Sequence, residues 1–229
     1  MFKTIKCIGV FLLLISMCAD SKSTPSPSTI GAMESYPVHR NIMATLFWVG
    51  EESKEDNGDT SNLGSVWDDN WMAHFGGVDT PKHRNGYMPS GFTPRENPFY
   101  VALPYNDFRK GNRKADAMAM IPWAQKRKWR DLESMCKNQW VKIVKDNKTV
   151  YAQWEDAGPF QYNDSKYVFG TAPPRNNINK KAGIDVSPAI GDYLNLTGMD
   201  KVEWQFVDEK DVADGPWKQI VTTSQIDWE

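Results

Sequence analysis

Short runs of β-branched and aromatic residues, spread between residues 43 and 222, constrain the fold of this chain more than any other feature. Several runs alternate apolar with polar residues, and Gly, Pro, Asn and Asp separate them, which is typical of short strands joined by turns. The clearest are MATLFWVG, FYVALP, QWVKIV, TVYAQWE, VEWQFV and WKQIVT. This pattern predicts a compact, mainly β domain over residues 43–222, and we expect it to be a barrel.

Two segments interrupt the strand pattern. Residues 51–98 form a long stretch rich in Gly, Asn, Asp and Pro, which in a compact domain is usually functional or poorly ordered. Residues 109–138 carry the basic sequence KRKWR and read as a mostly solvated insertion, with contact to an acidic polymer as the alternative. One helix is well signalled, from Ser187 to Leu196, because Ser is a good N-cap, Pro188 suits the first helical position and Gly198 follows.

The N-terminus has the pattern of an export signal. Lys3 and Lys6 precede a short apolar run, and residues 1–18 therefore predict a signal peptide. The sequence ISMC resembles a lipobox that ends at Cys18, which would carry a lipid anchor, and ordinary cleavage nearby is the alternative. Residues 19–42 contain a Ser/Thr/Pro-rich stretch and predict a flexible tether, and residues 223–229 a C-terminal tail.

Charge and cysteine content narrow the function classes. The net charge of -2 gives no polybasic footprint, so we expect no nucleic-acid partner. Of the 3 cysteines, only Cys136 lies beyond the N-terminal segment, so the mature fold must rely on packing without an internal disulfide. No HExxH or CxxC spacing is present, and we predict neither a metal nor a cofactor.

The sequence YAQWEDAGPF, residues 151–160, holds the first candidate catalytic residue. Asp156 ends an alternating run just before a Gly-Pro turn, so we expect its carboxylate at a barrel rim beside Trp154 or Phe160. A neighbouring apolar ring would raise its pKa toward that of a useful acid. Glu155 should point to the opposite face of the strand.

Asp185 is the second candidate. It stands just before the predicted helix, whose N-terminus would favour its ionised form. One protonated and one ionised carboxyl is a pattern that catalytic pairs use. The structural alternative is that both aspartates only bond the backbone of their own turn or cap.

The two motifs EDAGPF and AGIDVSPAIGDYL resemble those of double-psi β-barrel proteins of the rare lipoprotein A type, a barrel also found in expansins, barwin and small endoglucanases. The resemblance implies a six-stranded double-psi β-barrel over roughly residues 43–222. It also implies lytic transglycosylase activity, for which one acid/base can suffice because the sugar's own hydroxyl attacks. Asp156 matches the family's Asp before Gly-Pro, and Asp185 matches the Asp that expansins and their bacterial relatives require.

One departure weakens the catalytic implication. The family has a His shortly before a Leu-Pro strand end, and the matching stretch here, NPFYVALPYND, has none. His74 or His83 would have to fold back from the long loop, and we favour the interpretation that they are exposed polar residues. Asp107 offers a further carboxylate, although YND is also an ordinary turn.

Aromatic side chains suggest how a glycan would be held, since sugar C–H faces stack on aromatic rings. We expect some of Trp123, Trp154, Phe160 and Tyr167 to line a groove, with Asp107 nearby. The sequence therefore predicts an exported protein, periplasmic, anchored to the outer membrane or secreted, that engages peptidoglycan or another cell-wall polysaccharide. A non-catalytic expansin-like binding module and a structural envelope protein are the alternatives, and exposure of both aspartates in one cleft would favour the glycan hypotheses over the structural one.

Overall fold

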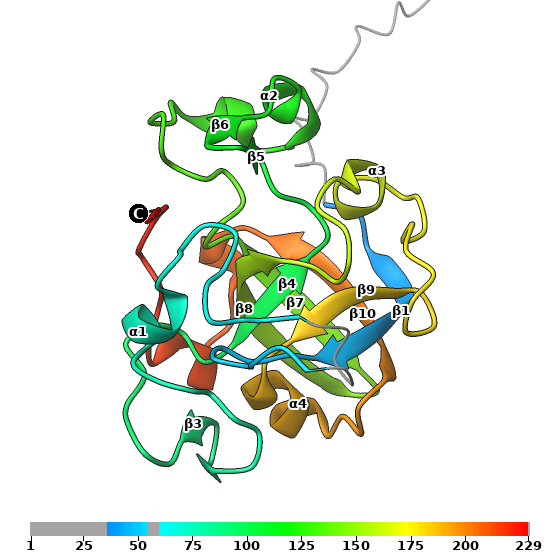
Figure 1. The fold of residues 1–229 in the computed structure, drawn as a ribbon. Helices are drawn as coiled ribbons and strands as arrows, with labels where there is room; N and C mark the ends of the chain where they lie inside the picture. Colours follow the sequence, from blue (N-terminus) through cyan, green and yellow to red (C-terminus); the bar gives the residue numbers. More distant parts are fainter. Residues whose placement is uncertain (1–35, 55–59, 229) are drawn as a thin grey trace, which may run out of the picture. The chain divides into compact units, whose positions relative to one another are not determined.

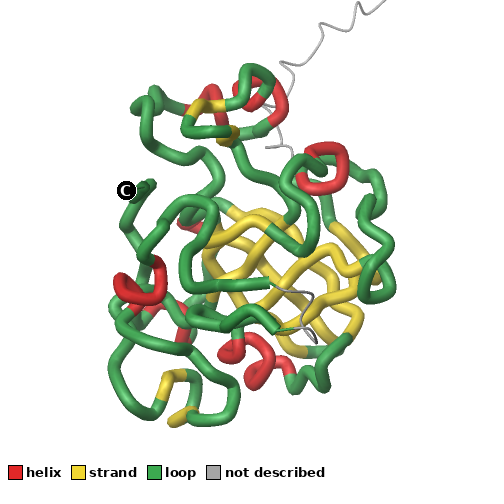
Figure 2. Tube along the Cα trace, in the orientation of Figure 1, coloured by secondary structure: helices red, strands yellow, loops and turns green. Residues whose placement is uncertain are grey.

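The computed structural model describes residues 36–54 and 60–228 (Figure 1). Six strands of this described part close into a barrel in the order β1, β10, β7, β8, β4, β9. Their bounds are β1 His39–Leu46, β4 Tyr100–Leu103, β7 Trp140–Lys145, β8 Lys148–Ala157, β9 Ala182–Val186 and β10 Asp200–Val207. The predicted mainly β architecture with a closed barrel is confirmed, and Figure 2 shows the strands gathered around one centre.

The barrel mixes parallel and antiparallel pairing. β1 pairs in parallel with β9, and β4 pairs in parallel with β8, while the other neighbours run antiparallel. Parallel neighbours cannot be joined by a tight hairpin, so the chain must cross the barrel between them. As a result β4 lies between β8 and β9, two strands that carry the motifs at 155–160 and 182–194.

The barrel interior is aromatic. Trp154 on β8 and Trp204 on β10 are fully buried, and both contact Phe206 at ring centroid distances of 5.7 and 5.3 Å. His39 is also buried and stacks on Trp204 at 3.9 Å. Its burial removes the charged form's hydration, which lowers its pKa to about 4. The tryptophans thus supply core area rather than an exposed sugar platform.

The remaining elements are short. They are the helices α1 Trp71–Phe75, α2 Ala117–Met120, α3 Ser165–Val168 and α4 Pro188–Leu194, the strands β2 Arg84–Asn85, β3 Met88–Pro89, β5 Phe108–Arg109 and β6 Asn112–Arg113, and 3₁₀ turns at Ala124–Lys126, Glu209–Asp211 and Pro216–Lys218. No helix of the described residues is both long and apolar enough to cross a membrane.

Helix α4 begins as the sequence predicts and ends earlier. The Ser187 hydroxyl accepts a hydrogen bond from the backbone N–H of Ile190, and Pro188 opens the helix. The helix ends at Leu194 rather than at the predicted Leu196, because Asn195 adopts a left-handed conformation with φ of 54°. Asn tolerates this conformation and therefore serves as the cap in place of the predicted Gly198.

The 51–98 segment packs against the outside of the barrel wherever the structure describes it. Trp71 and Phe75 of α1 join Phe47 and Tyr100 of the barrel region in a second buried apolar cluster. The indole N–H of Trp71 donates to the carboxylate of Glu96 at 3.1 Å. This packing gives the segment a core of its own and explains its scattered aromatic residues.

The 109–138 segment contains the hairpin β5–β6 and helix α2, and its basic cluster is largely paired within the chain. Lys126 contacts Asp208 at 2.9 Å, and Arg127 contacts Glu133 at 2.6 Å. Trp123 is buried in the barrel core instead of solvated. The insertion is thus only partly the solvated element that its composition suggests.

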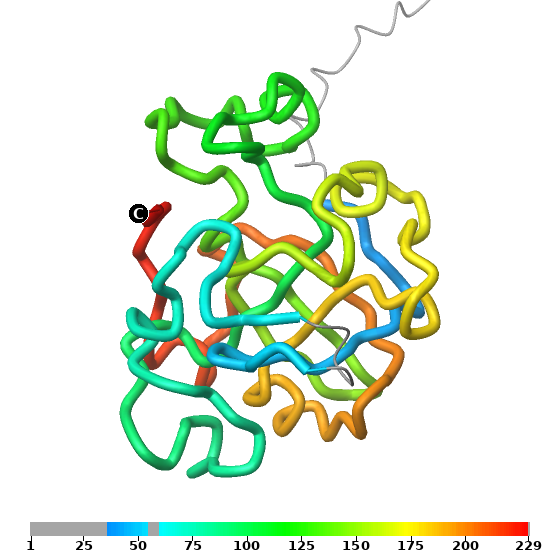
Figure 3. The backbone as a smooth tube through the Cα atoms, viewed as in Figure 1, coloured from blue at the N-terminus to red at the C-terminus, as the bar shows by residue number. Residues whose placement is uncertain are grey.

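The domain boundaries differ slightly from those predicted. β1 begins at His39, so residues 39–42 belong to the barrel and not to the tether. The predicted strand WKQIVT contains a 3₁₀ turn and no strand, and the segment after it runs beside the 60–75 segment, where the Asp227 N–H donates to Trp67 O at 2.8 Å (Figure 3). The predicted signal peptide, Cys18 and most of the tether lie outside the described residues.

Candidate functional site

A cleft of about 680 Å³ opens where β4, β8 and β9 lie next to one another. Its described walls come from the end of β1, the loop 60–66, the turn that follows β8, and Asp185 on β9. We call it the two-aspartate cleft, because Asp156 and Asp185 both line it. The sequence alternative in which each aspartate serves only its own turn is therefore not what the structure shows.

Ala102 on β4 explains why the two aspartates meet. It pairs with Asp156 of β8 on one side and with Asp185 of β9 on the other, so the small side chain separates two acidic ones. Gly158 allows this closeness, since a Cβ at that position would lie 3.3 Å from Asp185 Oδ2. The Asp-x-Gly-Pro motif thus supplies the carboxylate of Asp156 and, through Gly158, leaves room for the carboxylate of Asp185.

Each carboxylate keeps one described hydrogen-bond donor outside its own turn. Asp156 Oδ1 accepts the backbone N–H of Val66 at 2.9 Å, and Asp185 Oδ1 accepts the hydroxyl of Thr45. Asp156 is only 7% exposed. Both donors come from segments distant in sequence, so folding of β1 and the loop 60–66 builds the site around the acids.

Burial raises the pKa of Asp156 to about 7, and the Val66 hydrogen bond only partly offsets this. Burial also raises the pKa of Asp185 to about 7, while the Thr45 hydroxyl lowers it and the charge of Asp156 raises it. The sequence predicts that the helix terminus favours the ionised form of Asp185, and burial beside a second carboxylate opposes that effect and raises its pKa. Near pH 7 the pair is partly protonated and titrates as a coupled unit.

The cleft surface is acidic and partly apolar. Phe160 lines it as predicted from the sequence, together with Phe47, Tyr162, Ile178 and Met199, which sequence reasoning missed. Tyr162 and Ile178 are more than half exposed, at 56% and 52%. Among the described lining residues there is no lysine, arginine, histidine or tryptophan.

Four residues predicted to bind substrate do not line the cleft. Trp123, Trp154 and Tyr167 are buried in the barrel core. The Trp154 indole N–H donates to the Asp156 carbonyl oxygen at 2.7 Å, so this residue holds the backbone of the acid rather than a sugar. Alternation correctly places Trp154 and Asp156 on the same face of β8. In this closed barrel, that face is the interior, so Trp154 is buried.

Asp107 is the fourth residue and has a structural role. It is fully buried, and its carboxylate accepts hydrogen bonds from the Ser134 hydroxyl at 2.8 Å and the Met135 N–H at 2.7 Å. These bonds tie the turn after β4 to the end of the 109–138 segment. Burial raises the pKa of Asp107, and these donors oppose that rise.

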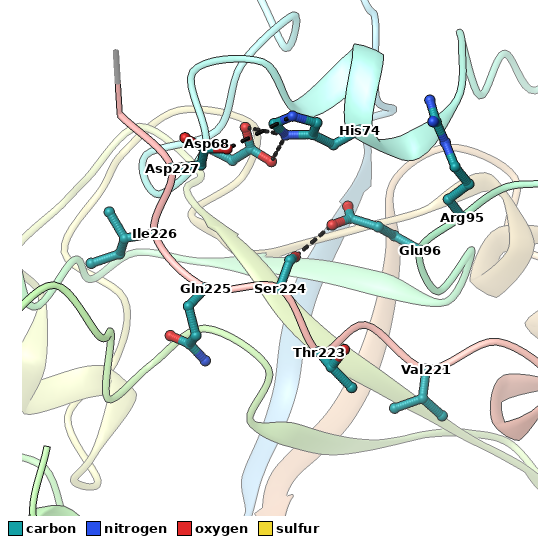
Figure 4. Close-up of a pocket in the computed structure, with 10 residues that line it drawn as sticks. All are labelled: Asp68, His74, Arg95, Glu96, Val221, Thr223, Ser224, Gln225, Ile226 and Asp227. Atoms are coloured by element: carbon teal, nitrogen blue, oxygen red, sulfur yellow. Dashed lines mark hydrogen bonds and ion pairs between the residues drawn. The ribbon is translucent and has the colours of Figure 1, made fainter. Parts of the chain in front are cut away.

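Glu155 points away from the cleft, as the strand alternation predicts. It forms a buried ion pair with Lys137 at 2.6 Å. Nearby, a separate pocket of about 400 Å³ contains His74, whose Nδ1 lies 2.8 Å from Asp68 Oδ2 (Figure 4). Neither His74 nor His83 lines the two-aspartate cleft, so neither supplies the histidine missing from the resemblance.

Comparisons with known proteins do not assign the chain to a family. No protein-family model matches the chain, and no curated protein matches it. Among solved structures, the Streptomyces papain inhibitor has a similar arrangement with 12% sequence identity, covering 76% of this chain and 98% of that chain, at a TM-score of 0.30. A similarity this weak has no bearing on function.

Proposed function

We propose that this protein is an exported double-psi β-barrel that binds a cell-wall glycan strand in the two-aspartate cleft, with Asp156 as the acid/base. The observation that carries the proposal is the placement of Asp156 and Asp185 on either side of Ala102 in one cleft. The double-psi assignment is supported by the crossed barrel with β1–β9 and β4–β8 in parallel. The motifs at the ends of β8 and β9 agree with it.

The chemistry needs a carboxylic acid that is still protonated near neutral pH. Protonated Asp156 would donate its proton to the glycosidic oxygen as the bond from C1 to that oxygen breaks. A hydroxyl group of the same sugar would then attack C1 through its own oxygen, which closes an anhydro ring. The Asp156 carboxylate would take the proton of that hydroxyl and so become the acid again. Burial supports this role, since it holds the pKa of Asp156 near 7.

Asp185 would act as the electrostatic partner of this acid. Its ionised form would stabilise positive charge at the sugar ring, as the second carboxylate does in glycoside hydrolysis. Because the charge of Asp156 raises the pKa of Asp185, loss of a proton from Asp156 favours retention of a proton by Asp185. Apolar rings of Phe160 and Tyr162 would contact the C–H faces of the sugar.

The second candidate function is a binding module without catalysis. It is favoured by one specific observation, that no histidine lies among the described residues of the cleft. Such a module would use the same apolar and acidic surface, and it would need no proton transfer. The two functions differ in whether the protein releases soluble sugars from the glycan.

Mass spectrometry of the soluble products from purified peptidoglycan tests the proposal, with Asp156→Asn as the matched variant. The catalytic proposal predicts anhydro-sugar products from the wild-type protein and none from the variant. Sedimentation of both proteins with the glycan, without released sugars, would identify the binding module. If neither protein sediments and no sugar is released, both functions are excluded for this polymer.

A further inference from the structure

A third pocket lies beside the two-aspartate cleft, and its charged lining residues are mainly basic. It has a volume of about 390 Å³, and the β5–β6 hairpin and the residues after it provide Arg109, Arg113 and Lys114. Asp116 is the carboxylate among its described lining residues. We call it the basic pocket. Its three cations against one acid favour a negatively charged ligand.

Several donors in the basic pocket are unused within the described part of the chain. Tyr105 is only 2% exposed, and its hydroxyl is buried without a hydrogen-bond partner. Arg113 Nε is likewise buried and unpartnered, although its Nη2 donates to two backbone carbonyls. The guanidinium of Arg109 makes no hydrogen bond or ion pair with a described residue. The Tyr105 hydroxyl and Arg113 Nε are therefore unusual buried donors, and the exposed Arg109 guanidinium is the donor that a ligand in the pocket can reach.

Lys114 adds a positioned positive charge. Its ammonium lies 4.5 Å from the centroid of the Tyr105 ring and donates to the carbonyl oxygen of Tyr162 at 2.8 Å. An ammonium has three donors, so others remain for a ligand. Partial burial lowers the pKa of Lys114, and an anion in the pocket would oppose that shift.

One chain segment separates the basic pocket from the two-aspartate cleft. Phe160 and Tyr162 line the cleft, while Asn163 and Ser165 line the basic pocket. Lys114 donates to the backbone carbonyl oxygen of Tyr162, a residue that lines the cleft. A branch of a ligand in the cleft would therefore have to cross only this segment to reach the basic pocket.

The two sites differ in what they can accept. The cleft offers an anionic sugar no positive charge, because its described lining residues include the carboxyl groups of Asp156 and Asp185 and no lysine or arginine. The basic pocket would instead attract an anionic group, because three cations and one carboxylate line it. From this charge separation we propose that the basic pocket binds an oxyanion on a side branch of the same glycan whose uncharged sugars occupy the cleft. This inference rests on the proposed function and specifies its substrate class.

The test compares glycans with and without acidic branches. We expect wild-type protein to bind peptidoglycan that carries its stem peptides about tenfold more tightly than enzymatically stripped strands whose exposed lactyl carboxyls have been converted to amides, since a hydrogen bond to a charged group is worth roughly one to two factors of ten. Arg109→Gln should remove this difference and leave binding to stripped strands unchanged. Lys110→Gln is the matched control, because it removes the same charge from the same hairpin outside the pocket.

Free anions test the pocket directly. In NMR titrations with N-acetylglutamate and with inorganic phosphate, the backbone resonances of Arg109, Lys114 and Tyr105 should shift in wild-type protein and not in Arg109→Gln. A stronger response to N-acetylglutamate identifies a carboxylate branch, and a stronger response to phosphate identifies a phosphorylated one.

The outcomes separate this inference from the proposed function. Equal binding of intact and stripped glycan, unchanged by Arg109→Gln, would overturn the inference while the proposed function stands. Failure of wild-type protein to bind either polymer would remove the proposed function and the shared-glycan inference together. The anion titration would then decide whether the pocket binds an oxyanion at all, and an absence of shifts would reject that as well.

Discussion

Replacing Asp156 by Asn should stabilise the protein at alkaline pH and leave it almost unchanged at acidic pH. The pKa of Asp156 rises from 3.8 to about 7 in the folded state because of burial. As the pH rises from 4 to 7, the unfolded chain therefore releases this proton while the folded protein retains it, and the free energy of unfolding falls. A shift of about 3 units at about 1.4 kcal/mol per unit gives up to about 4 kcal/mol, fully lost above pH 7.

Asn imitates the protonated acid, because it keeps the acceptor for the Val66 N–H and cannot ionise. Urea unfolding at pH 4 and pH 8 measures the effect as the difference between Asp156→Asn and wild type at each pH. We expect a difference near zero at pH 4 and a gain of a few kcal/mol for the variant at pH 8.

Asp131→Asn is the control, since this exposed aspartate belongs to a loop outside the cleft. It should change the free energy of unfolding by less than about 0.5 kcal/mol at both pH values. If Asp156→Asn were no more stable than wild type at pH 8, Asp156 would be an ordinary ionised carboxylate. The assignment of this residue as a neutral-pH acid would then be wrong.

Three further predictions follow from the packing and the charges. Lys137→Met should lower the free energy of unfolding by about 3 kcal/mol at pH 8, because it leaves buried Glu155 unpaired, and by less at pH 5, where Glu155 can take up a proton. Urea unfolding measures this loss, and the double variant Lys137→Met/Glu155→Leu should recover most of it. Gly183→Ala should cost about 1–3 kcal/mol in thermal unfolding, since its Cβ would lie 2.5 Å from the Tyr167 hydroxyl, whereas Gly91→Ala, with nothing within 4 Å, should be nearly neutral. If the cleft is catalytic, kcat/KM for glycan release should fall as the pH rises above about 7, because Asp156 then loses the proton that it must donate. A rate that keeps rising to pH 9 would contradict an acid of this pKa.

The sequence predicted the elements better than their surroundings. The strand-like runs indicated five of the six barrel strands, all but β9, and Ser187 with Pro188 located the start of α4 correctly. Alternation also separated Glu155 from Asp156, because successive side chains on a strand point to opposite faces. These features depend on local periodicity and capping, which a single sequence records.

Features that depend on distant segments could not be predicted. The donors Thr45 and Val66 lie far along the chain from the acids they contact, and the raised pKa of Asp185 arises from burial among such segments. Trp154 shares a face with Asp156, yet this face is the barrel interior, and nothing in the local pattern says so. The helix-terminus argument for Asp185 considered a local field and left out desolvation, which raises the pKa of this residue.

An NMR titration of the side-chain carboxyl carbons of Asp156 and Asp185, recorded with and without a soluble glycan strand, tests whether these aspartates form a glycan site. We expect both carboxyls to titrate near pH 7 in the free protein and both resonances to shift when the glycan is added. Titration of both near pH 4, with no response to the glycan, would contradict the claim that these aspartates form a glycan-binding site.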